Sequence, residues 1–158
     1  MQGHSNRTTY LYYKLYPCKV VNDINKYEFV CKRPPISNAH QLIWTVFSLG
    51  KYRRWELIVN GETVSTAEVM TKMPFYCFMP NNGIHIGPCQ TKPLHRGNGY
   101  YPILLSKIVA SYFPVRCYIF CSEANLASVR GINKAGGVVF ANGHRTKFGF
   151  YIIDNKYE

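Results

Sequence analysis

Residues 91–102 read TKPLHRGNGYYP and join two segments of different character. The apolar run Ile84–Cys89 precedes them and predicts a strand, whereas Tyr100–Tyr112 has the apolar spacing of a helix. A strand, a glycine turn and a helix N-terminus together favour an anion site, because free N–H groups and the helix dipole both attract negative charge. Gly97 and Gly99 allow unusual φ values and close approach of a ligand. The alternative is a surface loop that contains glycines, since a short glycine motif alone is weak evidence.

This turn resembles the acyl-coenzyme-A binding motif of the GNAT superfamily of N-acyltransferases. The motif runs Arg or Gln, two residues, Gly, one residue, then Gly or Ala, and Arg96, Gly99 and Tyr101 stand at these positions. Tyr101 replaces a small residue, so its side chain must point away from the pyrophosphate, or the cofactor must sit slightly differently. Pro102 suits the first turn of a helix, because its missing N–H would be unpaired there anyway. The resemblance implies that the following residues bind the cofactor: Cys89, Gln90, Thr91, Arg96, Gly97, Asn98, Gly99, Tyr100 and Tyr101.

A second match lies in residues 125–136, which read NLASVRGINKAG. Relatives carry an Asn, a small residue three positions later, and a Gly that closes the helix; Asn125, Ser128 and Gly136 fit. The resemblance implies that Asn125 contacts the pantetheine arm of the cofactor and that Ser128 lies close to it. Asn125 is also a good helix N-cap, and the two roles are compatible.

At 158 residues the chain is long enough for one domain with a real core. We expect a single GNAT-like domain, 1–158, with the acyl-CoA site in residues 82–142. The net charge of +11 favours an anionic partner, either nucleic acid or coenzyme A. Because the basic residues are scattered and form no long block, we expect no specific nucleic-acid partner.

The sequence has no apolar run of membrane-spanning length, and its first residues, MQGHSNRTTY, lack an apolar signal region. We therefore expect a cytoplasmic protein with no membrane partner. Six cysteines are scattered without a CxxC pair, so we expect no metal and interpret them as reduced, mostly buried thiols. The oligomeric state stays open, with a homodimer as one option.

Hydrophobic periodicity and turn residues predict a mixed α/β protein. Asn60-Gly61 is a strong hairpin signal, and we expect a second hairpin around Asn142-Gly143. Ser37 and Gly50 are expected to begin and end the early helix, and Gly136-Gly137 to end the last one. The expected strands are 10–16, 27–33, 55–59, 63–71, 84–91, 115–121, 138–142 and 147–153. The expected helices are centred on 39–47, 100–112 and 126–135.

This order suits a mixed, mostly antiparallel central sheet with flanking helices. The resemblance implies that two central parallel strands, 84–91 and 115–121, splay apart and admit the pantetheine arm. Relatives usually have two helices after the first strand. We expect only one, so the acceptor side of the site is expected to be unusual.

Acyl transfer from a thioester to an amine needs a neutral amine, a stabilised oxyanion and a protonated leaving thiol. A backbone N–H of Cys89, Gln90 or Thr91 is the expected oxyanion donor. Cys89 as a nucleophile is disfavoured, because the family transfers the acyl group directly. Strand alternation puts His85, Gly87, Cys89 and Thr91 on one face.

His85 is the first candidate base, because some relatives have a glutamate at this place and imidazole titrates near neutrality. A structural histidine is the alternative reading. Glu68 is the second candidate, with a solvated edge carboxylate as its alternative. Glu123 is the third candidate. The general-acid tyrosine of many relatives is replaced by Ile132, and nothing selects a substitute among Tyr112, Tyr118 and Tyr151.

We therefore expect an N-acetyltransferase that uses acetyl-CoA (coenzyme A) as its co-substrate and a primary amine as its acceptor. A catalytically degenerate coenzyme-A-binding protein and, less favoured, a basic nucleic-acid-binding domain remain open. The acceptor is equally open among amino sugars, small amines, amino acids and protein N-termini.

Overall fold

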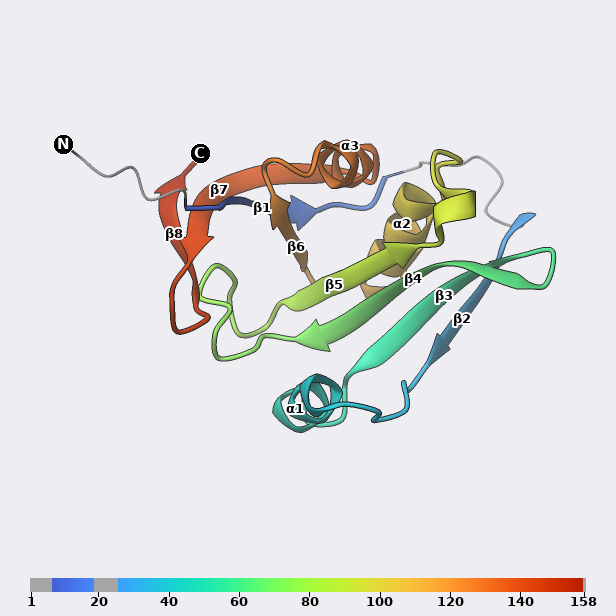
Figure 1. Cartoon of the computed structure of the whole chain (residues 1–158), viewed down its shortest axis with the longest axis horizontal. Helices are drawn as coiled ribbons and strands as arrows, with labels where there is room; N and C mark the ends of the chain where they lie inside the picture. Colours follow the sequence, from blue (N-terminus) through green and yellow to red (C-terminus); the bar gives the residue numbers. More distant parts are fainter. Residues whose placement is uncertain (1–6, 19–25, 158) are drawn as a thin grey trace.

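The computed structural model describes residues 7–18 and 26–157. Its strands form one eight-stranded sheet in the order β2-β3-β4-β5-β6-β1-β7-β8 (Figure 1). Neighbouring strands are antiparallel except for the central pair β5 and β6, as expected of a mixed sheet. The strands are β1 (Thr9–Leu15), β2 (Glu28–Lys32), β3 (Arg53–Val59), β4 (Glu62–Thr71), β5 (Ile84–Thr91), β6 (Cys117–Ser122), β7 (Gly137–Arg145) and β8 (Tyr151–Lys156). The helices are α1 (Ala39–Phe47), α2 (Tyr100–Tyr112) and α3 (Leu126–Lys134), with a short 3₁₀ turn, η2 (Pro93–His95).

The parallel strands β5 and β6 are paired only at their beginnings. Ile84 lies opposite Cys117 and His85 opposite Tyr118, and the pairing ends there. Figure 1 shows the two strands close together at one end and far apart at the other. The expected splay is therefore confirmed, and it opens a gap toward α2 and α3.

The N-terminal strand β1 lies inside the sheet, between β6 and β7. It pairs antiparallel with both neighbours along its length, so it joins the C-terminal strands to the splayed pair. Tyr12 and Tyr13 are fully buried on its two opposite faces. Each tyrosine belongs to a different core cluster.

The two faces of the sheet are covered differently. One face packs against α2 and α3 in a mainly aliphatic core that includes Leu57, Val69, Leu104 and Ile132. The other face carries an aromatic cluster built from the strands, from α1 and from the loop between β4 and β5. The gap between β5 and β6 therefore lies between an aliphatic layer and an aromatic one.

One of the two expected hairpins is confirmed. Asn60 and Gly61 have φ values of 52° and 77°, and they connect β3 to β4. The hairpin expected around Asn142-Gly143 is wrong, because β7 continues to Arg145 and turns only before Tyr151. A Cβ on Gly143 would lie 1.8 Å from the Ile152 carbonyl oxygen, so this glycine accommodates a register shift within the strand.

Helix α1 is capped by Asn38 and not by Ser37 as expected. The Asn38 side chain accepts the Gln41 N–H at 2.9 Å. The helix ends before Leu49 and Gly50, which both have positive φ, so the expected end of the helix near Gly50 is confirmed. Within the described residues it is the one α-helix between β1 and β3, as expected.

The expectation of mostly buried cysteines is wrong. Cys18, Cys31 and Cys77 are exposed, and Cys117 alone is fully buried. Cys31 lies on the edge strand β2 and Cys77 in the loop between β4 and β5, where neither position has a covering layer. All six thiols are free.

Candidate functional site

A cleft of about 350 Å³ lies in the gap between β5 and β6. Both strands contribute to its walls, and α2 and α3 close it on one side. Sequence reasoning had named five of its lining residues, namely His85, Cys89, Tyr101, Asn125 and Ser128. The other lining residues are Trp44, Tyr76, Ile86, Gly87, Pro88, Ile119, Phe120, Cys121 and Ser122.

A bulge in β5 forms the middle of the cleft wall. Ile86 lies opposite Val69 and Cys89 opposite Ala67, so β5 has one more residue than β4 between these pairs. The extra length falls at Gly87, whose φ is 143°, and Pro88. A glycine followed by proline inside a strand is the sequence signal that could have revealed this bulge.

The bulge changes which side chains share a face. Ile86 and Cys89 both pack against the aliphatic core. His85 instead stacks with aromatic rings of the opposite cluster. The expectation that His85 and Cys89 share one face is therefore wrong, because simple alternation does not continue across the bulge.

The end of β5 directs two N–H groups into the gap. The Lys92 N–H donates to the Val64 carbonyl at 3.0 Å. Because hydrogen bonding alternates along an antiparallel strand, the backbone N–H of Gln90 also faces β4, whereas the N–H groups of Cys89 and Thr91 point away from it. The three expected oxyanion donors are thus reduced to two.

The turn before α2 is an open row of backbone donors. Gly97 and Gly99 have φ values of 84° and 77°, and a Cβ on either would meet nothing within 4 Å. No hydrogen bond within the described part of the chain uses the backbone N–H groups of residues 97–101. Arg96 donates from Nε to the Thr91 carbonyl at 3.2 Å, so its guanidinium is held at the end of β5. This is the geometry expected of an anion site.

Tyr101 turns its ring away from this row and toward α3. A Cβ on Gly131 would lie 2.4 Å from the Tyr101 ring, so the missing side chain of Gly131 accommodates the tyrosine. The Tyr101 hydroxyl lies beside the Cys89 thiol, and burial raises the pKa of that hydroxyl well above its usual range. Of the two arrangements open from the sequence, the structure has the one that leaves the turn unobstructed.

The start of α3 also lies at the cleft. The Asn125 side chain accepts the Ser128 N–H at 3.2 Å, which confirms the N-cap. Both residues line the cleft as well. The structural and the cofactor-facing roles therefore coincide at this helix end.

His85 is sealed in an aromatic environment at the inner end of the cleft. It is only 3% exposed. Its ring centroid lies 4.4 Å from that of Tyr76 and 5.3 Å from that of Phe120. Neither ring nitrogen has a hydrogen-bond partner among the described residues, and burial lowers the pKa of His85 to about 3. The imidazole is therefore neutral throughout the physiological range.

Glu68 is buried, and the alternative reading of a solvated edge carboxylate is wrong. It lies on β4, inside the sheet, and is 7% exposed. Arg54 Nη2 approaches Glu68 Oε1 to 2.6 Å, and the Tyr52 hydroxyl donates to the other carboxylate oxygen. Both oxygens are engaged, and Glu68 does not line the cleft.

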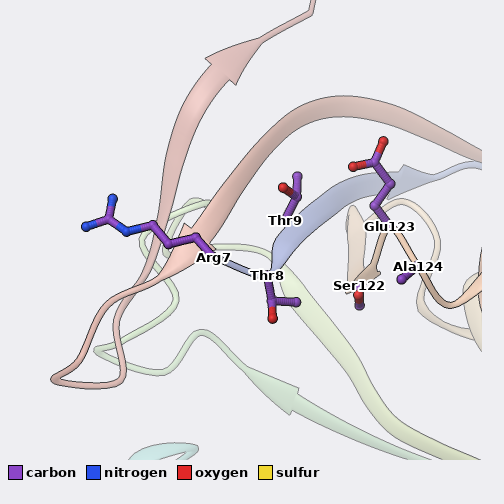
Figure 2. A pocket seen from close by; sticks show the side chains of 6 residues that line it. All are labelled: Arg7, Thr8, Thr9, Ser122, Glu123 and Ala124. Carbon is purple, nitrogen blue, oxygen red and sulfur yellow. The ribbon is translucent and has the colours of Figure 1, made fainter. Parts of the chain in front are cut away.

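A second, shallower hollow of about 430 Å³ lies beside the end of β6. It shares Ser122 with the cleft, and its other lining residues are Arg7, Thr8, Thr9, Glu123 and Ala124. Figure 2 shows the Glu123 and Thr9 side chains on one side of the strands and those of Thr8 and Ser122 on the other. Glu123, the third candidate base, thus lies outside the cleft but next to it.

The tyrosines suggested as substitutes for the general acid lie elsewhere. Tyr112, Tyr118 and Tyr151 do not line the cleft, and Ile132 is fully buried in the aliphatic core. The phenols that do line it are Tyr76 and Tyr101. Sequence reasoning had named Tyr101 as a cofactor-binding residue and as a departure from the motif, but not as a candidate proton donor.

Residues 7–18 and 26–157 contain no group of three or more His, Cys, Asp or Glu side chains placed to hold a metal ion. No helix in these ranges is long and apolar enough to cross a bilayer.

The fold matches solved structures although the sequence is divergent. No family model matches the chain, and no curated protein matches it. An acetyltransferase from the GNAT family of Colwellia psychrerythraea matches with a TM-score of 0.58 at 13% identity over 86% of this chain. The chain has the GNAT fold. The GNAT-like architecture expected from residues 91–102 is thereby confirmed.

Two further GNAT structures extend the comparison. A tandem GNAT protein from the clavulanic acid biosynthesis pathway matches with a TM-score of 0.55 at 14% identity over 85% of this chain. The aminoglycoside acetyltransferase AAC(6')-Ib in complex with coenzyme A matches with a TM-score of 0.52 at 13% identity, covering 79% of this chain and 92% of that one. The chain spans 54% of the Colwellia structure, 51% of the tandem protein and 61% of a GNAT-family structure from Novosphingobium aromaticivorans.

Proposed function

We propose that this GNAT-fold chain is an N-acyltransferase that moves an acetyl group from acetyl-CoA directly to a primary amine. One observation carries the proposal: the cleft between β5 and β6 is lined by Tyr101 in the first turn of α2, and the N–H groups of residues 97–101, which begin that helix, have no acceptor among the described residues. A nucleotide diphosphate with a long, thin arm has the shape and charge for this combination. The same fold occurs in an aminoglycoside acetyltransferase solved with coenzyme A, which supports the proposal.

In this proposal the turn and the strand edge bind different parts of the co-substrate. The N–H groups of residues 97–101 and the Arg96 guanidinium receive the pyrophosphate. The gap between β5 and β6 receives the pantetheine arm, with Asn125 and Ser128 on its α3 side. Tyr101 forms part of the wall without covering the turn.

The proposed reaction takes place at the bulge of β5. The amine nitrogen attacks the thioester carbonyl carbon, a C–N bond forms, and the C–S bond breaks with its electron pair moving to sulfur. The Cys89 N–H points into the gap and is placed to receive the developing oxyanion. Burial raises the pKa of the Cys89 thiol, so it stays protonated and is unsuited to be a nucleophile.

His85 is the proposed hydrogen-bond acceptor for the attacking amine. It lines the cleft, and both of its ring nitrogens are buried and unpartnered within the described chain, so accepting the amine requires the rings of Tyr76 or Phe120 to move aside. Because its pKa is lowered to about 3, it cannot retain the proton near neutrality, and the proton passes to water. We therefore expect the rate to rise with pH as the acceptor ammonium loses its proton, and not as His85 does.

Tyr101 is the proposed proton donor to the leaving thiolate. It is the phenol that lies beside Cys89, next to the proposed path of the pantetheine arm. A coenzyme thiolate is also a tolerable leaving group without help, because the pKa of a free thiol is about 8.5. We assign Glu68 to holding Arg54 and Tyr52, since both of its oxygens are engaged.

A coenzyme-A-binding protein without catalysis is the second candidate. It is favoured by Ile132, which stands where many relatives have a catalytic tyrosine and is fully buried. A nucleic-acid-binding role is supported only by the charge of +11.

An amine panel with acetyl-CoA and a free-thiol readout tests the proposal. Amino sugars, small amines, amino acids and peptide N-termini are each incubated with protein and acetyl-CoA. Thiol release above the hydrolysis background with at least one class is the expected result. Coenzyme A binding without thiol release across all four classes would favour the non-catalytic alternative.

A further inference from the structure

Helix α1 presents its apolar side outward. Besides Trp44, which packs on Tyr52, the residues it turns toward the protein are polar: Gln41 is 7% exposed and Ser48, just past the helix end, is 1% exposed. Its large apolar residues are exposed instead, with Val46 at 60% and Phe47 at 51%. The exposed apolar side chains of this segment are Ile36, Leu42, Ile43, Val46, Phe47 and Leu49. We call these six residues the α1 apolar face.

The inward polar groups are satisfied by hydrogen bonds within the α1 segment itself, so Gln41 can stay buried without a partner on another element. Gln41 Oε1 accepts the Ser37 N–H at 2.8 Å and the Ser37 hydroxyl at 2.7 Å. The Thr45 hydroxyl donates to the Gln41 carbonyl at 2.8 Å. These bonds lie within residues 37–45 and would turn with the helix, whereas rotating it to bury its apolar side would take Trp44 off Tyr52, on which it packs.

The α1 apolar face lies at the margin of the molecule. Figure 1 shows α1 at the lower edge of the fold, on its own and away from α2 and α3. Six large apolar side chains are exposed within fourteen residues, and such a concentration of exposed apolar residues is typical of an interaction surface.

The surroundings of this face are basic. No Asp or Glu occurs between Glu28 and Glu56. Lys32 pairs with Arg54 in the β2–β3 register, which brings the end of β2 to the start of β3, next to α1. The cations of this end are Lys32, Arg33, Lys51, Arg53 and Arg54.

Not all of these cations are neutralised by carboxylates. Lys32 and Arg54 form ion pairs with Glu56 and Glu68. Arg33, Lys51 and Arg53 have no carboxylate within ion-pair distance in the described residues. The apolar face is therefore bordered by uncompensated positive charge.

We propose that α1 docks this protein on an anionic lipid surface. The apolar face enters the boundary between headgroups and acyl chains, and the flanking cations contact the lipid phosphates and carboxylates. Such a helix lies in the interface and needs no spanning segment; this docking departs from the sequence expectation of no membrane partner, which rested on the lack of a membrane-spanning run. Trp44 belongs to α1 and lines the cleft, so docking brings one side of the cleft to the lipid surface.

Charge favours lipid over a second copy of the chain. A two-fold contact between two α1 faces would place the basic border of one copy against that of the other. Like charges across such a contact oppose association, whereas an anionic bilayer attracts both the cations and the apolar side chains.

Vesicle sedimentation with two matched double variants tests this proposal. The test variant is Val46→Ser with Phe47→Ser on α1. The control is Val138→Ser with Phe148→Ser, which removes the same side chains from sites that are 56% and 77% exposed on another part of the surface. Both variants keep the net charge, and circular dichroism melts establish that each is folded. Vesicles are phosphatidylcholine alone or phosphatidylcholine with phosphatidylserine.

Wild-type protein is expected to sediment with the phosphatidylserine vesicles and much less with phosphatidylcholine alone. The α1 variant is expected to bind about tenfold more weakly, since two apolar side chains are lost from the lipid boundary. The control variant is expected to stay within about twofold of wild type, because its charge is unchanged and its substitutions lie outside the α1 apolar face.

Three results would overturn the proposal. Absence of wild-type binding to either vesicle is the first. Equal binding by the α1 variant and wild type is the second, because it would show attraction by net charge alone. The third is a concentration-dependent dimer in sedimentation velocity that the α1 variant abolishes while vesicles leave it unchanged, which would make the face a contact between copies. None of these readouts depends on coenzyme A.

Discussion

At the outer end of the cleft, the N–H groups of residues 97–101 and the Arg96 side chain face open space, whereas at the inner end His85 is enclosed by Tyr76 and Phe120. The outer end attracts anions through backbone donors, a helix dipole and a cation. At the inner end, burial disfavours the charged form of His85 and lowers its pKa to about 3. The difference shows how one gap in a sheet can bind the phosphates of a co-substrate at one end and enclose uncharged groups at the other.

The largest expected effect tests whether the outer end of the cleft is an anion site. Gly99→Val should weaken coenzyme A binding at least about a hundredfold, because a β-branched residue resists positive φ and disturbs several charge-assisted hydrogen bonds. Isothermal calorimetry measures the loss. Gly61→Val is the matched control, since Gly61 has the same φ of 77° and equally open surroundings. It should lower the melting temperature similarly and leave the affinity unchanged; equal affinity losses in both variants would reduce the turn to an ordinary loop.

The middle of the cleft is tested through Tyr101. Tyr101→Phe should lower kcat about tenfold or more, because it removes a positioned proton donor, with water as a partial substitute. The ring remains against Gly131, so coenzyme A affinity should change little. Tyr112→Phe provides the control, since Tyr112 packs against Trp55 and does not line the cleft. An unchanged kcat in Tyr101→Phe would leave protonation of the thiolate to water.

An effect on stability, and not on binding or turnover, tests the inner end. His85 has a folded-state pKa of about 3, below its unfolded value of about 6.5. Below about pH 6.5 the unfolded chain therefore takes up a proton that the folded chain refuses, and stability is lost as the pH falls. The loss should be about 1.4 kcal/mol per pH unit down to about pH 3.

His85→Met removes this proton linkage while filling the site with an apolar side chain. Urea unfolding from pH 7 to pH 4.5 should give wild type a steeper decline in the free energy of unfolding than the variant. Parallel declines would mean that His85 titrates normally in the folded protein and that the inner end is wetter than its aromatic lining implies.

Much of the fold could be predicted from sequence where local signals agree with tertiary structure. The bounds of β5 and α2 match the expectation, because Thr91–Pro102 combines turn chemistry with a change of hydrophobic period. The same signals failed where packing decides. Asn142-Gly143 is a strong hairpin signal, yet here Gly143 serves a register shift inside β7. The insertion of β1 between β6 and β7 depends on pairing over about a hundred residues, which no local pattern encodes.

The candidate site was predictable in part for the same reason. Asn125, Ser128 and the glycine turn lie in contiguous motifs; the structure places Asn125 and Ser128 at the cleft and the glycine turn at the start of α2, whose Tyr101 lines the cleft. The faces of His85 and Cys89 were not predictable by alternation, because the bulge at Gly87 and Pro88 shifts the register. Burial of Glu68 followed from the position of β4 inside the sheet, which its own sequence does not reveal.

The central claim is that the turn and the cleft together bind coenzyme A. Calorimetric titration of coenzyme A into the wild-type protein tests it most directly. We expect one saturable site, and a melting curve at a hundredfold excess over Kd should show a gain in stability of about 2.7 kcal/mol. Absence of binding heat and of thermal stabilisation at millimolar coenzyme A would contradict the claim.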